Sequence, residues 1–221
     1  MHSNRHTVAA VHSPVTDSTF HVLSAADILY DNASLEQYGL SKQAFEYAWK
    51  GYQRLLEKKM ITRSRYLTIC DFSQSSKQKR LYIIDIATNE LITNTYVAHG
   101  RNSGGEYATK FSNTPESLQS SLGFFITQST YIGAHGLSLR LQGVDGQFNN
   151  KAFARSIVIH GAAYVDENRV RAGGYMGRSW GCPALPQKES SSIITTIKGG
   201  TCLFIYHPVR TYLVGSTILN G

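Results

Sequence analysis

The first clear pattern of apolar and polar positions runs from Ser41 to Lys59. In the segment SKQAFEYAWKGYQRLLEKK, apolar side chains recur every three or four positions, with Lys, Glu and Arg between them. This spacing predicts an amphipathic helix. Before it, SLEQ at Ser34–Gln37 has the Ser-x-x-Gln form of a capping box, which predicts the start of an earlier helix. We expect both helices to pack on the rest of the chain through an aromatic face made of Phe45, Ala48, Trp49, Tyr52, Leu55 and Leu56. A ligand groove lined by the same Trp and Tyr side chains is the alternative.

From residue 64 the pattern changes to short runs of β-prone residues separated by Gly, Asn, Pro and Ser. Such runs predict strands, and their spacing favours a sandwich or barrel over a βαβ sheet. One late helix is indicated by KESSSIITTIK, which Gly199 and Gly200 would end. The expected strands are residues 65–72, 80–86, 91–97, 122–127, 137–141, 156–160, 201–206 and 211–218.

These patterns predict the domain organisation. Residues 1–20 are polar and irregular, and we expect a flexible tail there. Residues 21–62 are expected to form a helical segment packed on the domain that follows. Residues 63–221 would then form a mainly β domain, so the fold class is mainly β with flanking helices (α+β).

The charge of the chain suggests an anionic partner. Its 22 basic and 15 acidic residues give a formal net charge of +7, and a basic surface attracts anions. Because the nearest basic cluster, Lys77–Arg80, reads as a solvated turn, we expect no nucleic acid. An anionic cell-wall polymer or lipid headgroups suit the charge better.

No apolar stretch approaches the roughly 20 residues of a membrane-spanning helix, so we expect no stable membrane insertion. The N-terminus also lacks the apolar core of a signal peptide. We expect the protein to be a monomer.

The three cysteines divide into two kinds. Cys70 and Cys202 stand in apolar runs and are expected to be buried free thiols, although a bridge between them is an alternative. Cys182 lies instead between Gly181 and Pro183. Because proline disfavours the α region for the residue before it, the Cys182 thiol should sit at a tight, extended corner.

Cys182 is a candidate nucleophile with His160 as its base. A free thiol is mostly protonated at neutral pH and needs a base or an electropositive setting. His160 closes the apolar run SIVI, which would hold its ring at the rim of a sheet. A glycine-rich loop between the two residues could fold Cys182 back over that rim. The competing interpretation is an unrelated cysteine and histidine.

The flanks of Cys182 limit where an oxyanion could be stabilised. Because Pro183 has no N–H, the donors would be the backbone N–H groups of Gly181, Cys182 or Trp180. Ser179 could add a further donor. The guanidinium of Arg178 could bind a substrate carboxylate as a fork.

A metal site is the other chemical alternative. His99 and His135, with His160 and Cys182, contain the ring nitrogens and thiolate that zinc prefers. No pair has a short ligand spacing such as H-x-x-x-H or C-x-x-C. We therefore expect no metal and no other cofactor, and we expect His99 and His135 to line a polar cleft or cap turns.

At these residues the chain resembles a known family. The run IVIHGAAY followed by GRSWGCPALP resembles the His-Gly and Ser-x-Gly-Cys motifs of murein L,D-transpeptidase catalytic domains, which have the YkuD-like fold. NTPESLQSSLGFFIT is similar to the family's Thr-Pro and Gly-x-Phe element. The resemblance covers roughly residues 35–217, and the cysteine motif is its most specific part.

The resemblance implies a YkuD-like β-sandwich or barrel and a thioester mechanism. Cys182 would be the nucleophile and His160 the base, with the ring oriented by the backbone carbonyl of Gly161 or Ala162. The implied substrate is the stem peptide of peptidoglycan, which places the protein in the cell envelope or periplasm, or outside the cell. Alternatives on the same scaffold are an L,D-carboxypeptidase or endopeptidase, and a non-catalytic wall-binding module.

The chain departs from the family pattern at two positions. Ala184 stands where many members have Arg or Asn, and Trp180 where His, Lys or Arg is frequent. Substrate contacts there are therefore expected to come from Arg178 or Arg155.

Overall fold

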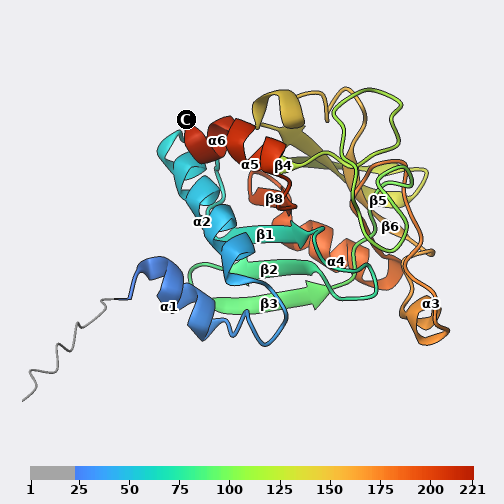
Figure 1. Cartoon of the computed structure of the whole chain (residues 1–221), viewed down its shortest axis with the longest axis horizontal. Coiled ribbons are helices and arrows are strands. Elements are labelled where there is room, and N and C mark those ends of the chain that lie inside the picture. Colours follow the sequence, from blue (N-terminus) through green and yellow to red (C-terminus); the bar gives the residue numbers. More distant parts are fainter. Residues whose placement is uncertain (1–22) are drawn as a thin grey trace, which may run out of the picture.

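A single eight-stranded sheet forms the centre of the protein (Figure 1). The computed structural model describes residues 23–221, so the tail expected at residues 1–20 lies outside the described residues. The strand order is β3-β2-β1-β8-β4-β5-β6-β7, and the pairs β1·β8 and β6·β7 are parallel. The strands are β1 Tyr66–Asp71, β2 Leu81–Asp85, β3 Glu90–Thr95, β4 Gly123–Gly133, β5 Gly136–Gly143, β6 Val158–Ala162, β7 Ala184–Pro186 and β8 Cys202–Tyr206.

The two edges of this sheet come together, so the sheet is nearly a closed barrel. The chain leaving edge strand β3 forms an antiparallel bridge between Ala98 and Ala184 of the opposite edge strand, β7. Ala98 N–H donates to the Ala184 carbonyl at 2.9 Å, and Ala184 N–H donates back at 3.3 Å. The expected mainly β fold with flanking helices is therefore confirmed.

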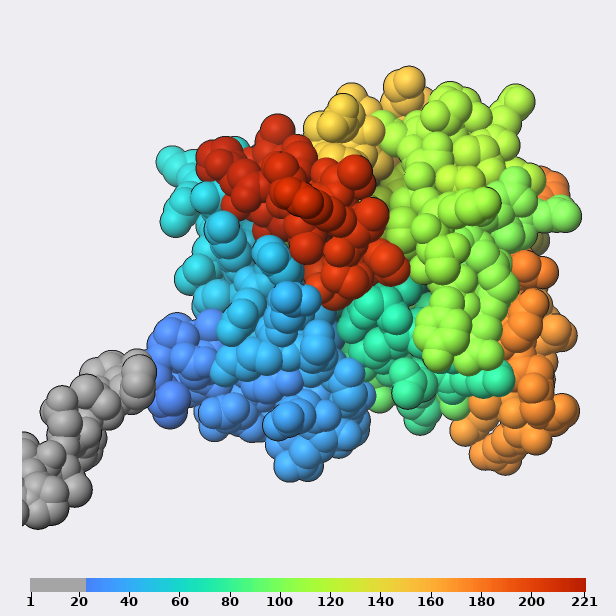
Figure 2. Space-filling model, in the orientation of Figure 1, coloured from blue at the N-terminus to red at the C-terminus, as the bar shows by residue number. Residues whose placement is uncertain are grey.

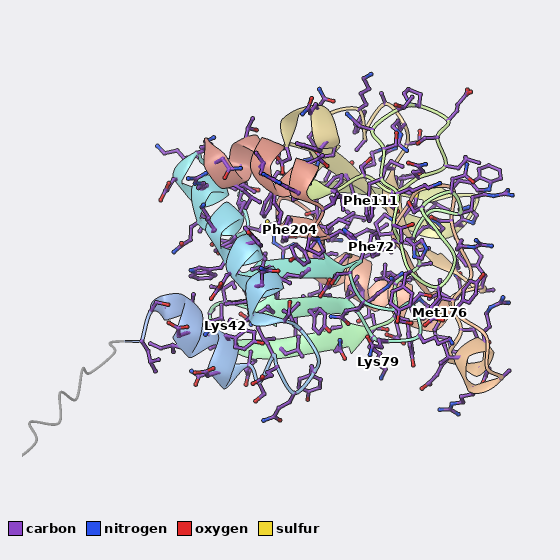
Figure 3. All side chains as sticks on the ribbon, in the orientation of Figure 1. Lys42, Phe72, Lys79, Phe111, Met176 and Phe204 are labelled. Atoms are coloured by element: carbon purple, nitrogen blue, oxygen red, sulfur yellow. The ribbon has the colours of Figure 1, made fainter. Side chains whose placement is uncertain are left out.

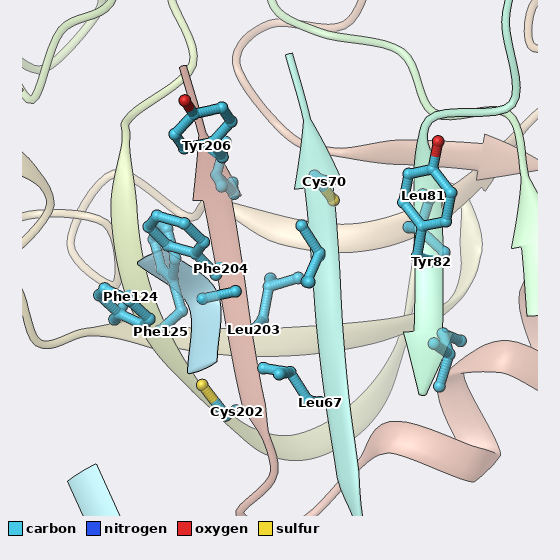
Figure 4. Close-up of a cluster of buried hydrophobic side chains, with 14 of the residues drawn as sticks. Leu67, Cys70, Leu81, Tyr82, Phe124, Phe125, Cys202, Leu203, Phe204 and Tyr206 are labelled. Carbon is cyan, nitrogen blue, oxygen red and sulfur yellow. The ribbon is translucent and has the colours of Figure 1, made fainter. Parts of the chain in front are cut away.

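The core lies between the curved sheet and the helices, and it is rich in aromatic side chains (Figure 4). Phe124 and Phe204 stack with ring centroids 4.1 Å apart. Cys70 and Cys202 are fully buried free thiols, as expected, and the alternative bridge between them is absent.

The amphipathic pattern of the N-terminal region forms helix α2, Lys42–Glu57, as predicted. Its buried face includes Phe45, Ala48, Tyr52 and Leu55, so the aromatic stripe packs in the core and is not a groove. Gly51 is needed on this face, because a Cβ there would lie 1.9 Å from the ring of Phe124. The division of the chain near residue 62 remains a prediction.

The capping box predicted at Ser34–Gln37 is wrong. Helix α1, Ala25–Asn32, begins earlier, with Ser24 as the cap and Asp27 as its reciprocal partner. Ser34 instead has a positive φ of 50° in the turn that follows. That turn directs Leu35 and Leu40 into the core, where both are at most 1% exposed.

The strand predicted at residues 211–218 is also wrong. This segment forms helices α5, Arg210–Gly215, and α6, Thr217–Asn220. Helix α6 packs against α2, and Figure 2 shows this C-terminal segment (red) lying against the N-terminal helices (blue). β-propensity favours a strand here, but buried hydrogen bonds to Asp145 hold the helical form.

The remaining helices complete the frame around the site. The predicted late helix is α4, Gln187–Ile197, which packs on β6. Helix α3, Glu167–Arg171, the 3-10 turn η1, Gly146–Phe148, and strand β7 were not predicted. Among the described residues, no helix is both long and apolar enough to cross a membrane.

Candidate active site

The parallel pairing of β6 and β7 brings Cys182 to His160. His160 stands opposite Ala184 in this pair, so residue 182 is level with Val158, two positions before the histidine. The N–H of Val158 donates to Cys182 Sγ at 3.5 Å. The thiol and the imidazole therefore line the same cavity, although a long loop separates them in sequence.

A backbone carbonyl orients the imidazole. Nδ1 of His160 lies 2.9 Å from the carbonyl oxygen of Gly161. Because a carbonyl can only accept, Nδ1 carries the proton and Nε2 keeps the lone pair that a base needs. Gly161 has no room for a side chain, since a Cβ would lie 2.4 Å from Ser190 Oγ on α4.

A second imidazole covers the first. His135, in the turn between β4 and β5, stacks on His160 with ring centroids 4.4 Å apart and planes 21° apart. Its ring is exposed, so it forms part of the entrance to the site. The β4–β5 hairpin therefore lies beside the candidate base.

The loop that carries the thiol is held in one conformation by Ser179 and Gly181. The Gly181 N–H donates to Ser179 Oγ at 3.0 Å, and Ser179 Oγ donates to the Cys182 carbonyl at 2.6 Å. Gly181 has φ +125°, and a Cβ there would lie 2.8 Å from the Gln119 carbonyl oxygen. Glycine is therefore required before the thiol for both reasons.

Two backbone donors remain available beside the thiol. The N–H of Gly181 is already used by Ser179. For the N–H groups of Trp180 and Cys182, the structure of residues 23–221 records no protein acceptor. Of the three backbone donors predicted near the thiol, only the Gly181 N–H therefore has a protein acceptor in this part of the chain.

The candidate thiol and imidazole line a cavity of about 440 Å³. Tyr131 and Tyr164 line it without having been predicted, since nothing in their local sequence distinguishes them from core tyrosines. The predicted site residues that line it are Cys182, His160, Ser179, Trp180, Arg178, Arg155 and His135.

Burial sets the protonation states of the two central groups. It raises the pKa of the Cys182 thiol, although the Val158 N–H and the charge of Arg155 oppose the shift. Burial also lowers the pKa of His160; the Gly161 carbonyl opposes this shift, and His135 adds to it. At neutral pH the site therefore holds a neutral thiol beside a neutral imidazole.

Arg155 lines the cavity, but protein oxygens occupy its guanidinium. It donates to the carbonyls of Ser112 and Gln119, both at 2.8 Å, and to the hydroxyls of Ser117 and Ser121. The hydrogen bonds of Arg155 thus hold residues 112–121 in place near the thiol. Since most of its donors are used, little of its fork is free for a substrate carboxylate.

His99 lies outside the cavity, in the protein interior. Its ring is 1% exposed, Nδ1 lies 2.7 Å from Nη2 of the buried Arg80, and Nε2 has no hydrogen-bond partner. Its carbonyl accepts from the Ser179 N–H at 3.0 Å. Its backbone therefore supports the thiol loop.

The four residues considered as metal ligands do not form one site. Within the described part of the chain, no three His, Cys, Asp or Glu residues lie close enough together to hold a metal ion.

We expect His99 to make the fold sensitive to mild acid. Burial and the charge of Arg80 lower the pKa of His99 from 6.5 to about 3. Above pH 6.5 the ring is neutral in both states, whereas below it the unfolded chain binds a proton that the folded chain does not. The free energy of unfolding should fall by about 2 kcal/mol at pH 5 from this group, and further towards pH 3.

Urea unfolding at pH 7 and pH 5 measures this loss. His99→Gln, which keeps an acceptor for Arg80, should lose less stability between the two pH values than the unmodified chain. An equal loss in both proteins would show that His99 does not titrate as its burial implies.

Most of the chain matches a family of known proteins. The model of a family described as "L,D-transpeptidase catalytic domain" matches residues 36–206. No curated protein matches the sequence.

Solved structures with a similar arrangement share little sequence with the chain. An L,D-transpeptidase from Mycobacterium smegmatis is 12% identical with a TM-score of 0.41, and 65% of this chain covers 59% of that one. L,D-transpeptidase 3 from Mycobacterium tuberculosis is 10% identical with a TM-score of 0.41, and the shares are 65% and 61%. The helical cell shape determining protein Pgp2 from Campylobacter jejuni is 12% identical with a TM-score of 0.42, and the shares are 78% and 61%. The chain thus spans less than two thirds of each of these proteins.

Proposed function

Because this chain belongs to the family of L,D-transpeptidase catalytic domains, we propose that it is a cysteine acyl-transferase acting on peptidoglycan stem peptides through a thioester on Cys182. The observation that carries the proposal is the arrangement of the thiol and an oriented imidazole on the wall of one cavity. Peptidoglycan lies outside the cytoplasm, so the protein would act in the cell envelope.

The first half of the reaction forms the thioester. As Sγ of Cys182 attacks the carbonyl carbon before a terminal D-residue, Nε2 of His160 takes the thiol proton. The carbonyl oxygen becomes an oxyanion. The N–H groups of Trp180 and Cys182 would stabilise it as hydrogen-bond donors. Collapse breaks the C–N bond, and His160 returns the proton to the departing amine.

The second half of the reaction decides the product. An amine of another stem that attacks the thioester gives a crosslink and regenerates the thiol. Water at the same point gives a shortened peptide, which is the carboxypeptidase or endopeptidase outcome. His160 would serve as base in both cases, so the acceptor and not the dyad separates the two activities.

The test is incubation of the protein with a stem tetrapeptide. Intact-mass spectrometry should show an acyl adduct that maps to Cys182, with release of the terminal D-residue. Peptide dimers indicate transfer to an amine, and tripeptide alone indicates hydrolysis. Binding of the peptide with no adduct and no product would contradict the enzyme proposal and favour a wall-binding module.

A further inference from the structure

A second cavity, of about 380 Å³, adjoins the one that contains the thiol. Arg178 and Trp180 line both cavities, so the two share a rim. The second cavity lies between α3 and the loop that follows it, in the region where Figure 3 labels Met176. Arginines from three parts of the chain, Arg101, Arg169 and Arg178, line it together with Tyr175.

The charge of this arginine cavity is uncompensated. No Asp or Glu is among its lining residues. Within residues 23–221, none of its three arginines forms an ion pair. Arg171, two residues after Arg169 on α3, does pair with Glu167 at 3.3 Å. Three guanidinium groups around one hollow repel one another, and an anion bound between them would remove that repulsion.

The three arginines are exposed and keep free donors, and two of them also contact the protein. Nη1 of Arg178 donates to the Gly104 carbonyl at 3.0 Å, and its guanidinium lies 5.8 Å from the ring centroid of Tyr175. Nε of Arg169 donates weakly to the Tyr175 carbonyl at 3.4 Å. A guanidinium has five N–H donors, so each arginine can still bind a carboxylate through two of them.

The arginine cavity is also joined to the thiol loop. The N–H of Arg101 donates to the Ser179 carbonyl at 2.8 Å, three residues before Cys182. Trp180, which separates the cavities at their shared rim, is 75% exposed. The arginine cavity therefore neighbours the thiol cavity across Trp180, within the span of a peptide bound at the thiol.

We propose that the arginine cavity is a subsite for a side carboxylate of the substrate peptide, distinct from the carboxylate of the terminal residue. The proposal rests on the proposed function for the identity of the peptide. The planar fork of arginine matches a carboxylate in geometry as well as in charge. Recognition at this subsite selects peptides with a free acid over the same peptides with a carboxamide.

The test uses equilibrium binding to the Cys182→Ala chain, which cannot form a thioester. Two stem tetrapeptides are compared, one with free side carboxylates and one with those groups converted to carboxamides. We expect the acid peptide to bind about tenfold more tightly. Arg169→Gln and Arg101→Gln should each remove most of that difference, by weakening only the acid peptide.

Arg171→Gln is the matched control, because Arg171 is on the same helix but outside the cavity; it should keep the full difference. Equal affinity for the two peptides in the Cys182→Ala chain would overturn the subsite, as would an equal loss for both peptides in Arg169→Gln. The two proposals fail in different ways. If the proposed function is wrong, the unmodified chain forms no thioester. If only the subsite is wrong, the unmodified chain still forms a thioester on the amidated peptide.

Discussion

Replacing His160 with alanine is expected to slow thioester formation on Cys182 by about 100- to 10,000-fold, the range typical of a lost general base. The physical reason is the raised pKa of the Cys182 thiol, which burial keeps protonated at neutral pH. Without His160 the cavity loses the imidazole whose Nδ1 is bound by the Gly161 carbonyl and whose Nε2 keeps the lone pair for the thiol proton. Cys182→Ala should abolish the adduct altogether.

The pH dependence separates this role from a structural one. In His160→Ala the thiolate must form without help, so the adduct rate should rise about tenfold per pH unit until the pKa of Cys182 is reached. The unmodified chain should show a much flatter profile above the lowered pKa of His160. Single-turnover mass spectrometry from pH 6 to 10 measures both.

A matched control uses a histidine that is partly buried elsewhere in the fold. His207 stacks on Phe111 with ring centroids 4.9 Å apart and does not line the thiol cavity. His207→Gln should leave the adduct rate within about twofold. Parallel pH profiles for His160→Ala and the unmodified chain would remove His160 from the mechanism.

Replacing Asp145 with alanine is expected to lower the free energy of unfolding by about 3 kcal/mol. Asp145 is fully buried and accepts from Tyr212 Oη at 2.7 Å and from Ser216 Oγ at 2.8 Å. Alanine would leave both hydroxyls without their charged acceptor, in a place that water does not reach. The contacts of α5 and α6 with the sheet should loosen first.

Urea unfolding and amide hydrogen exchange measure this effect. Tyr212→Phe, which removes a single donor, should cost less than Asp145→Ala, about 1 kcal/mol. Asp31→Ala provides the surface control, since Asp31 is exposed on α1; its effect should stay within about 0.5 kcal/mol. A similar loss for Asp31→Ala and Asp145→Ala would rule out Asp145 as the anchor of the C-terminal helices.

The elements that could be predicted from the sequence are those with a strong local period. Helix α2 lies within its predicted segment because its buried side chains recur at helical spacing, and the predicted strand segments overlap every strand except β7. Residues 211–218 have the composition of a strand but fold as two helices, since their partner Asp145 lies about 70 positions earlier. No local pattern contains that contact. The same holds for β7, a three-residue strand that exists through its neighbours.

The candidate dyad could be identified because each member has a local mark. His160 ends an apolar run, and Cys182 lies between glycine and proline. The surroundings of the dyad carry no such mark. Arg155 was expected at the substrate, yet four oxygens of residues 112–121 take up its donors. His99 was expected to line a polar cleft or cap a turn, yet its ring is buried beside Arg80. Arg80 itself was expected in a solvated turn, yet its side chain is fully buried.

The sequence by itself determined which segments have a buried face, that the chain carries an excess of positive charge, and which cysteine stands apart from the core. Only the tertiary structure decided that β7 meets the chain after β3, that Nδ1 of His160 is bound by Gly161, and that Arg101 joins Arg169 and Arg178 around one hollow. The physical reason is that period and composition act between near neighbours along the chain, whereas burial, hydrogen-bond partners and local charge depend on residues that folding alone brings together.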